Sequence, residues 1–221
     1  PGTSNPFIEL SAGPTATFST MTACPGVTSR PDTTAIYGTT VHETITGPNI
    51  AGTISGGTGR GIRPGRTCSG MSEGGDGADS LVGGAGDDIY QFNTNDVDTG
   101  EAITEASSGG TDTISVITST DFANMSTASF DEIEVINFAG ASQTATFKGS
   151  QLTAEVLSLT ETVAGTSNLI VEVESGTTAT FTTMTADTFS TSTDSLAING
   201  TTGNETITGP NIERQHSCLF E

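Results

Sequence analysis

Two consecutive nonapeptides, Gly74-Gly75-Asp76-Gly77-Ala78-Asp79-Ser80-Leu81-Val82 and Gly83-Gly84-Ala85-Gly86-Asp87-Asp88-Ile89-Tyr90-Gln91, decide the fold of this chain. Both fit the pattern G-G-x-G-x-D-x-U-x, in which U is a large apolar residue. The same nine-residue spacing extends backwards, because a glycine also stands at positions 38, 47, 56 and 65. The six units of residues 38–91 therefore predict a coil of short strands joined by glycine-rich turns.

Each residue type in the pattern suggests a structural role. The paired glycines adopt backbone conformations with φ > 0 and let carbonyl oxygens come close to a cation. The aspartate at the sixth position, Asp79 or Asp88, adds a carboxylate, and Ca²⁺ prefers mixed shells of carboxylate and carbonyl oxygens. The apolar residue at the eighth position, Leu81 or Tyr90, points inward because side chains alternate along a strand. We therefore expect the glycine-rich turns to bind calcium ions.

With these nonapeptides the chain resembles the RTX family of secreted bacterial calcium-binding proteins, whose repeats are of the surface-layer and haemolysin type. The resemblance implies an all-β fold, a right-handed parallel β-roll or β-solenoid with two nonapeptides per turn. It also implies calcium ions shared by loops that lie two nonapeptides apart, and export to the extracellular space or the bacterial cell surface. The match is specific over residues 74–91, fair over 38–55 and 200–212, and general elsewhere.

Candidate metal ligands fall into three groups. The glycine-rich loops come first, with aspartates at or near the sixth position and glycine carbonyls around them. Next come the sixth-position glutamates of the nonapeptides that begin at residues 38 and 200. The third group is an oxygen-rich loop over residues 93–101. The candidates in these groups are Gly74, Gly75, Asp76, Gly77, Asp79, Gly83, Gly84, Gly86, Asp87 and Asp88, then Glu43 and Glu205, and finally Asp96 and Asp98.

The partner loops of these candidates differ in sequence from the family pattern. In a turn of two nonapeptides, Asp79 faces Gly61 and Asp88 faces Gly70. Each site is therefore expected to lack one carboxylate on its partner loop. The stretches 60–73 and 213–221 hold most of the chain's arginine, cysteine and histidine residues, and two interpretations remain open for them. They are either metal-poor interruptions of the roll or misread, frame-shifted sequence.

The composition excludes several classes of function. The chain has 221 residues, with 26 acidic against 6 basic residues and a formal net charge of −20. Such a charge disfavours nucleic acid and anionic membranes as partners, but it suits a protein that collects divalent cations. No run of 18 apolar residues occurs, so we expect no direct membrane insertion. The 3 cysteines cannot all pair within one chain, which argues against a disulfide framework.

An internal duplication organises the rest of the chain. The segments at positions 2–5, 15–18 and 21–23 recur at 165–168, 178–181 and 184–186, and those at 38–40 and 43–50 recur at 200–202 and 205–212. The second copy has lost a single position before its last two segments. We divide the chain into a β-rich end of a repeat unit (1–37), a nonapeptide roll (38–91), a β-rich solenoid or sandwich-like segment (92–199) and the start of the next roll (200–221). We favour a solenoid for the third segment and expect the sequence to belong to a longer or processed polypeptide.

The third segment contains seven candidate strands and one candidate helical turn. Glycine, serine or asparagine usually separates the strand candidates, and no sustained helical periodicity interrupts them. The predicted strands are 113–117, 133–138, 144–148, 156–159, 169–173, 178–182 and 195–198, and the predicted helical turn lies within 121–129.

No catalytic constellation is evident. His42 and Glu43 begin like a zinc-protease helix, but Thr46 stands where the second histidine would be needed. We therefore expect no enzymatic activity. The sequence favours a secreted structural repeat protein that is folded by Ca²⁺, self-associates into a layer or filament, and forms or anchors an extracellular surface layer, sheath or fibril. The alternative is a calcium-binding module of a larger secreted enzyme, toxin or adhesin.

Overall fold

A computed structural model describes residues 69–189 and 193–210 continuously and, before them, the strands β1 to β6. The strands of the first part are β1 (Phe7–Glu9), β2 (Thr15–Thr17), β3 (Thr34–Tyr37), β4 (Glu43–Thr46), β5 (Gly52–Ser55), β6 (Gly61–Arg63), β7 (Met71–Glu73), β8 (Ser80–Val82), β9 (Ile89–Phe92) and β10 (Ala102–Thr104). The second part holds β11 (Thr113–Val116), β12 (Thr120–Asp121), the 3-10 helix η1 (Thr127–Ser129), β13 (Val135–Phe138), β14 (Thr144–Lys148), α1 (Gly149–Leu152), β15 (Ser158–Glu161), β16 (Asn168–Glu172), β17 (Thr178–Thr180), β18 (Thr185–Ala186), β19 (Ser195–Asn199) and β20 (Thr206–Thr208).

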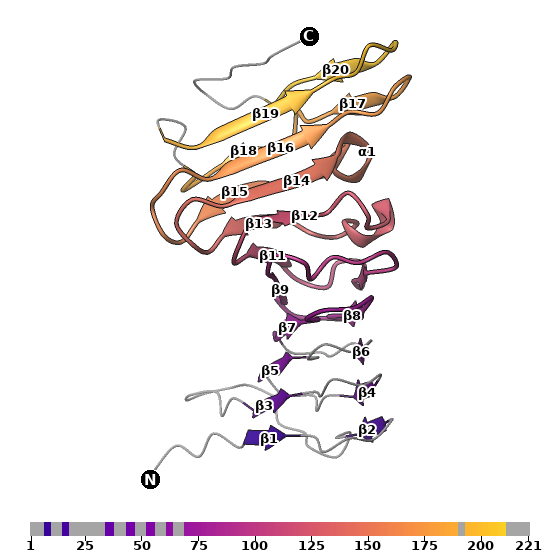
Figure 1. Ribbon diagram of the computed structural model, residues 1–221, viewed down its shortest axis with the longest axis vertical. Helices are drawn as coiled ribbons and strands as arrows, with labels where there is room; N and C mark the ends of the chain where they lie inside the picture. The colour runs from indigo at the N-terminus through magenta and orange to yellow at the C-terminus, as the bar shows by residue number, and fades with distance from the viewer. Residues whose placement is uncertain are drawn as a thin grey trace.

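These strands stack into a parallel β-solenoid, as the sequence predicts. The odd-numbered strands β1 to β15, followed by β18, form one nine-stranded parallel sheet. Beside it lie a five-stranded sheet in the order β10-β8-β6-β4-β2, a four-stranded sheet in the order β12-β14-β16-β19, and the pair β17-β20. Figure 1 shows one coil of chain, here called a rung, lying on the next from β1 at one end to β20 at the other.

The rungs from β3 to β9 have the length that two nonapeptides give. Thr34 of β3 lies opposite Gly52 of β5, and Met71 of β7 lies opposite Ile89 of β9, so the register advances by two nonapeptides per rung. From β9 onward the rungs lengthen, because Ile89 lies opposite Thr113 and Val135 lies opposite Ser158. The additional residues build a third side, the four-stranded sheet that begins at β12.

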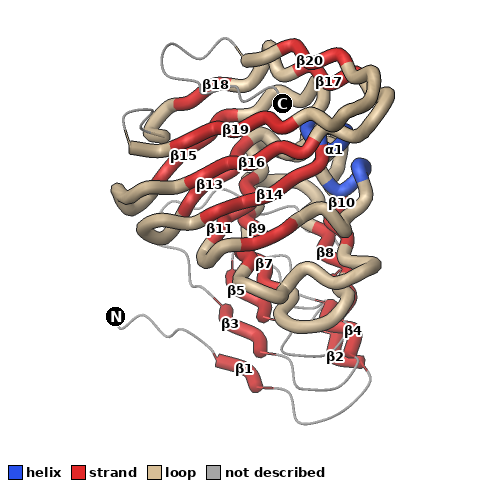
Figure 2. Tube along the Cα trace, turned by 45° about the horizontal axis from the view of Figure 1, so that its top comes forward, coloured by secondary structure: helices blue, strands red, loops and turns tan. Residues whose placement is uncertain are grey.

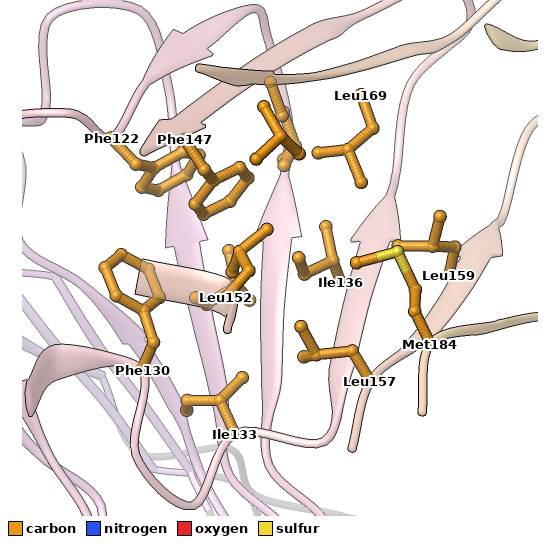
Figure 3. Close-up of a cluster of buried hydrophobic side chains, with 14 of the residues drawn as sticks. Phe122, Phe130, Ile133, Ile136, Phe147, Leu152, Leu157, Leu159, Leu169 and Met184 are labelled. Atoms are coloured by element: carbon orange, nitrogen blue, oxygen red, sulfur yellow. The ribbon is translucent and has the colours of Figure 1, made fainter. Parts of the chain in front are cut away.

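The core changes with the length of the rung. In the short rungs Leu81 and Tyr90 fill the interior with no exposed surface, and the buried Ser72 holds the equivalent place in β7. The longer rungs enclose more volume, and phenylalanines fill it (Figure 3). The rings of Phe122 and Phe147 stack with centroids 4.6 Å apart, and Phe130 meets Phe147 edge-on at 5.4 Å. Such pairs add about 0.5–1.5 kcal/mol each to the burial of their area.

Two short helical segments occupy the side of the long rungs where β10 would otherwise continue (Figure 2). The 3-10 helix η1 contacts both β10 and α1, and α1 contacts β17. Gln151 of α1 is buried, and its Nε2 donates to the carbonyl oxygens of Phe122 and Met125 at 2.8 and 2.9 Å. These bonds tie one rung to the next where no strand pairing is available.

Most strands of the second half agree with the sequence prediction. The strand expected over 144–148 coincides with β14, and the other six candidates overlap β11, β13, β15, β16, β17 and β19. The helical turn expected within 121–129 is η1. The prediction did not include β10, β12, β18 or α1, which are two to four residues long and carry little periodicity. Over the described residues, no helix combines the length and apolar character that crossing a membrane requires.

Candidate metal centre

The two complete nonapeptides adopt the same turn. Gly75 and Gly77 have φ of 82° and 112°, and the equivalent Gly84 and Gly86 have φ of 98° and 105°. Residues with a Cβ avoid these conformations, so the second and fourth positions of the pattern require glycine. The turn therefore follows directly from the sequence pattern.

The first glycine of each nonapeptide has a different role. A Cβ on Gly74 would lie 2.7 Å from Oδ2 of Asp79, and a Cβ on Gly83 would lie 2.8 Å from Oδ2 of Asp88. The same relation holds between Gly200 and Oε1 of Glu205, at 2.9 Å. The first glycine thus leaves room for the acidic side chain at the sixth position to fold back over the turn.

Acidic residues stand directly before three consecutive strands of the nine-stranded sheet, and we call Asp88, Asp112 and Glu134 the carboxylate ladder. Each accepts a hydrogen bond from the backbone N–H of the preceding rung. Gly70 N donates to Asp88 Oδ1 at 2.8 Å, Asp88 N donates to Asp112 Oδ1 at 2.8 Å, and Asp112 N donates to Glu134 Oε2 at 2.7 Å. The ladder brings negative charge from successive rungs into one column.

Two further acids occupy the equivalent place on the five-stranded sheet. Asp79 precedes β8 and Glu101 precedes β10, and Asp79 N donates to Glu101 Oε2 at 2.6 Å. Glu101 is only 2% exposed, and its Oε1 has no hydrogen-bond partner among the described residues. A buried carboxylate oxygen without a donor is costly, so a bound ion or proton is needed to compensate it.

Among the described residues, one cluster of three carboxylates joins two neighbouring rungs. Ligand atoms of Asp88, Glu105 and Asp112 all lie within 4.8 Å of one another. Glu105 comes from the residues that follow β10; its Oε2 accepts from Gly84 N at 2.9 Å, and its Oε1 accepts from the Tyr90 hydroxyl. We call these three residues the acidic centre.

Backbone oxygens lie beside the acidic centre as well. A Cβ on Gly109 would lie 2.6 Å from the Gly84 carbonyl oxygen and 2.8 Å from that of Ala106, with Asp112 Oδ2 at 3.7 Å. Gly109 therefore leaves open a space that borders two carbonyl oxygens and the carboxylate of Asp112. Carboxylate and carbonyl oxygens together form the mixed shell that calcium prefers.

Burial makes these carboxylates hold protons more tightly when no cation compensates them. It raises the pKa of Glu105 to about 7, with Asp112 and Asp88 adding repulsion. Burial and the nearby Glu134 raise the pKa of Asp112 to about 6, and burial with Asp79 and Asp96 nearby raises that of Glu101 to about 9. Residues 69–189 and 193–210 contain one basic residue, Lys148. Protons or an added cation must therefore balance this charge.

The donor set discriminates between metals. Its donors are hard oxygens, and no histidine or cysteine side chain belongs to the acidic centre. Zinc and copper favour nitrogen and sulfur ligands, whereas calcium and magnesium favour oxygen. The residues of the acidic centre therefore fit a hard divalent cation. Outside this centre, the buried Oε1 of Glu101, which has no hydrogen-bond partner among the described residues, is a ligand atom of the same kind.

The remaining sequence candidates lie outside the acidic centre. Asp76 and Asp87 are exposed on the turns, and Asp87 Oδ1 accepts from Thr111 N at 2.9 Å. Asp96 is buried, but its Oδ2 accepts from Asn93 N at 2.6 Å and so closes its own loop, while Asp98 is exposed.

The two sixth-position glutamates differ in how much the structure describes. The side chain of Glu43 lies outside the described residues, although its backbone lies opposite Gly61. Glu205 accepts from Thr201 N through Oε1, and among the described residues its buried Oε2 has no hydrogen-bond partner.

Sequence reasoning missed Glu101, Glu105, Asp112 and Glu134. The assumption of a constant turn of two nonapeptides paired Asp88 with Gly70, and the structure does place these two together across 18 residues. On its other side, however, Asp88 meets Asp112 across 24 residues, and Asp79 meets Glu101 across 22. The expected lack of a partner carboxylate therefore holds on one side of Asp88 only. An acid directly before a strand is the signal that would have identified Asp112 and Glu101.

Comparisons with known proteins add no relative. No protein-family model, no curated protein sequence and no solved structure matches this chain.

Proposed function

We propose that this chain is a secreted, calcium-binding structural repeat protein whose solenoid is folded by Ca²⁺ and which forms or anchors an extracellular surface layer, sheath or fibril. The observation that carries the proposal is the acidic centre, in which Asp88, Glu105 and Asp112 converge from neighbouring rungs. An ion bound there would join the loops of residues 83–88 and 105–112, and so would fasten two rungs to each other.

The charge of the chain makes such binding decisive for folding. Residues 69–189 and 193–210 carry 21 acidic residues and one basic residue. At low calcium the ionised carboxylates repel one another, which keeps an exported chain loose. At about 10 mM calcium, with dissociation constants of about 0.1–1 mM, each site would stabilise the fold by roughly 1.4–2.7 kcal/mol.

The fold supports a structural role. A solenoid contacts only its own neighbouring rungs, so it covers distance with little sequence information, and long repeats extend it without a new domain. The exposed apolar residues are few and scattered: among the described side chains the large ones are Tyr37, Val156 and Val163. Self-association of such rods would then build the layer or filament.

A calcium titration of the whole chain tests the proposal. We expect far-UV circular dichroism to gain its β signal, and isothermal titration calorimetry to detect binding, in the millimolar range of Ca²⁺. Mg²⁺ at the same concentration should bind more weakly, because it keeps its water and demands octahedral geometry. A chain that is equally folded and equally stable in chelator and in 10 mM calcium would contradict the proposal.

A further inference from the structure

A second group of buried acids lies apart from the acidic centre. Asp79, Asp96 and Glu101 are 1%, 5% and 2% exposed. Asp79 belongs to the turn of the first complete nonapeptide and directly precedes β8. Asp96 and Glu101 belong to the loop of residues 93–101, which leads into β10. The acidic centre uses the turn of the second nonapeptide and residues that follow β10, so the two groups occupy different turns of the solenoid.

Backbone contacts place the carboxylate of Glu101 beside the turn of Asp79. Asp79 N donates to Glu101 Oε2 at 2.6 Å, and Ala102 N donates to the carbonyl oxygen of Asp79 at 2.9 Å. Burial raises the pKa of Glu101, and repulsion from Asp79 and Asp96 adds to this effect, so both acids lie within electrostatic reach of it. Three buried carboxylates therefore lie close together between β8 and β10.

One oxygen of this group has no donor. Glu101 Oε1 is buried and has no hydrogen-bond partner among the described residues, whereas Oε2 of the same carboxylate is bonded. A proton would neutralise Glu101 alone and would leave the charges of its acidic neighbours in place. A divalent cation compensates two carboxylates at once, and calcium prefers oxygen ligands of this kind. The unbonded oxygen therefore favours a cation over a proton.

The loop of residues 93–101 shields these acids from solvent. Asp96 Oδ2 accepts from Asn93 N at 2.6 Å, and the Asn93 side chain donates to Glu73 Oε1 at 3.0 Å, which fastens the loop to β7. Val97 packs against the hydrophobic core. An ion held beneath this loop can leave only when the loop opens, and such local opening costs free energy.

We propose that the turn of residues 74–79 and the loop of residues 93–101 enclose a second divalent-cation site, in which the carboxylates of Glu101 and Asp79 are ligands and Asp96 adds negative charge. Its ion would fasten β8 to β10, as an ion in the acidic centre would fasten the rungs on the other sheet. The inference rests on the calcium binding proposed above, but it uses a separate set of residues, so the two can fail independently.

Replacing Glu101 with glutamine tests the site. Glu101→Gln keeps the size of the side chain and an oxygen that accepts from Asp79 N, and it resembles a protonated glutamate. Native mass spectrometry of the whole chain counts the bound calcium ions, and mixing with a fluorescent chelator measures how fast they leave. We expect the wild type to release one ion about ten-fold or more slowly than the others. Glu101→Gln should bind one ion fewer and lose this slow phase.

Two further variants complete the experiment. Asp79→Asn, which also preserves size, should give the same loss and serves if Glu101→Gln does not fold. The matched control is Glu172→Gln, because Glu172 is exposed on β16 and its Oε1 accepts from the Asn199 side chain, far from both groups of acids. This control should bind and release calcium like the wild type.

Equal ion counts and release rates in the wild type and Glu101→Gln would overturn the inference, because Glu101 would then carry a proton. Release of all bound calcium from the wild type in one fast phase would also overturn it, and this result needs no variant. Glu105→Gln separates the two sites: it should remove a rapidly released ion and keep the slow phase. A wild type that binds only rapidly released calcium would leave the proposed function standing, whereas one that binds no calcium would refute both.

Discussion

Replacing Asp112 with asparagine should have opposite effects on stability with and without calcium. Asp112 has two separable roles in the structure. Its Oδ1 accepts a hydrogen bond from Asp88 N at 2.8 Å, and its charge lies within the acidic centre. The amide oxygen of an asparagine accepts the same hydrogen bond, so Asp112→Asn removes the charge and keeps the bond between rungs.

In chelator the variant should be at least as stable as the wild type. The pKa of Asp112 is about 6, so at pH 7.5 the carboxylate is ionised beside Glu134 and Asp87. Removing this charge relieves repulsion, and we expect an increase in the free energy of unfolding of up to about 1 kcal/mol.

In 10 mM calcium the variant should be less stable than the wild type. If the loss of this anionic ligand raises the dissociation constant for calcium about ten-fold, the stabilisation by bound calcium falls from roughly 1.4–2.7 to roughly 0.4–1.4 kcal/mol. Urea unfolding followed by circular dichroism, in calcium and in chelator at pH 7.5, measures both effects. Asp121→Asn is the control, since Asp121 is exposed and its Oδ1 accepts only from Ala123 N, away from the acidic centre.

The sign of the difference decides the interpretation. A variant whose stability changes by the same amount in calcium and in chelator would show that the charge of Asp112 does not act through a bound cation. The acidic centre would then hold no ion, and the reasoning from converging carboxylates would be refuted.

Three further predictions address the turn, the core and the pH dependence. Gly83→Ala should weaken calcium binding, measured by calorimetry, by about ten-fold or more, because a Cβ there would collide with Glu105 Oε1 and the Tyr90 hydroxyl. The control is Gly209→Ala, which should bind calcium like the wild type because a Cβ on Gly209 would have nothing within 4 Å. Equal losses of affinity in both variants would refute the role of the turn. Phe147→Ala should cost about 3–5 kcal/mol in urea unfolding both with and without calcium, since it empties the stacked position beside Phe122; a loss seen only in calcium would contradict a purely structural role. In chelator the free energy of unfolding should fall as pH rises from 5 to 9, because the folded pKa values of Asp112 (about 6), Glu105 (about 7) and Glu101 (about 9) lie above their ordinary values and the folded state binds more protons. In calcium the same scan should stay nearly flat between pH 5 and about 7, because the ion replaces those protons and the unfolded carboxylates have already lost theirs, and a fall as steep as in chelator would show that no cation competes for them.

The sequence predicts the repeating part of the fold well because each residue of the nonapeptide has one local task. Gly75, Gly77, Gly84 and Gly86 need their conformations whatever surrounds them, and Leu81 fills a rung of fixed length. The parallel solenoid and its short rungs follow from those local requirements.

The candidate site was predicted only in part, because its other half depends on where the rung changes length. Asp79 and Asp88 are identifiable from the pattern, but Glu101, Glu105 and Asp112 meet them only because the spacing between rungs grows from 18 to 22 or 24 residues at β9, ahead of the third side that begins at β12. Residues such as Phe122 and Gln151, which support that side, follow no period. Tertiary packing therefore sets the spacing between these acids, and no local pattern records it.

The direction of the hydrogen bonds has a mechanical consequence. In this solenoid the bonds between strands run along the long axis, so a pull on the two ends loads them one rung at a time (Figure 1). Each short rung of 18 residues that opens would release roughly 60 Å of chain, and each long rung, such as the 27 residues from Asn168 to Ser195, about 90 Å. A solenoid of this kind would extend gradually under force, and each opening event would release the most chain where the rungs contain the most residues.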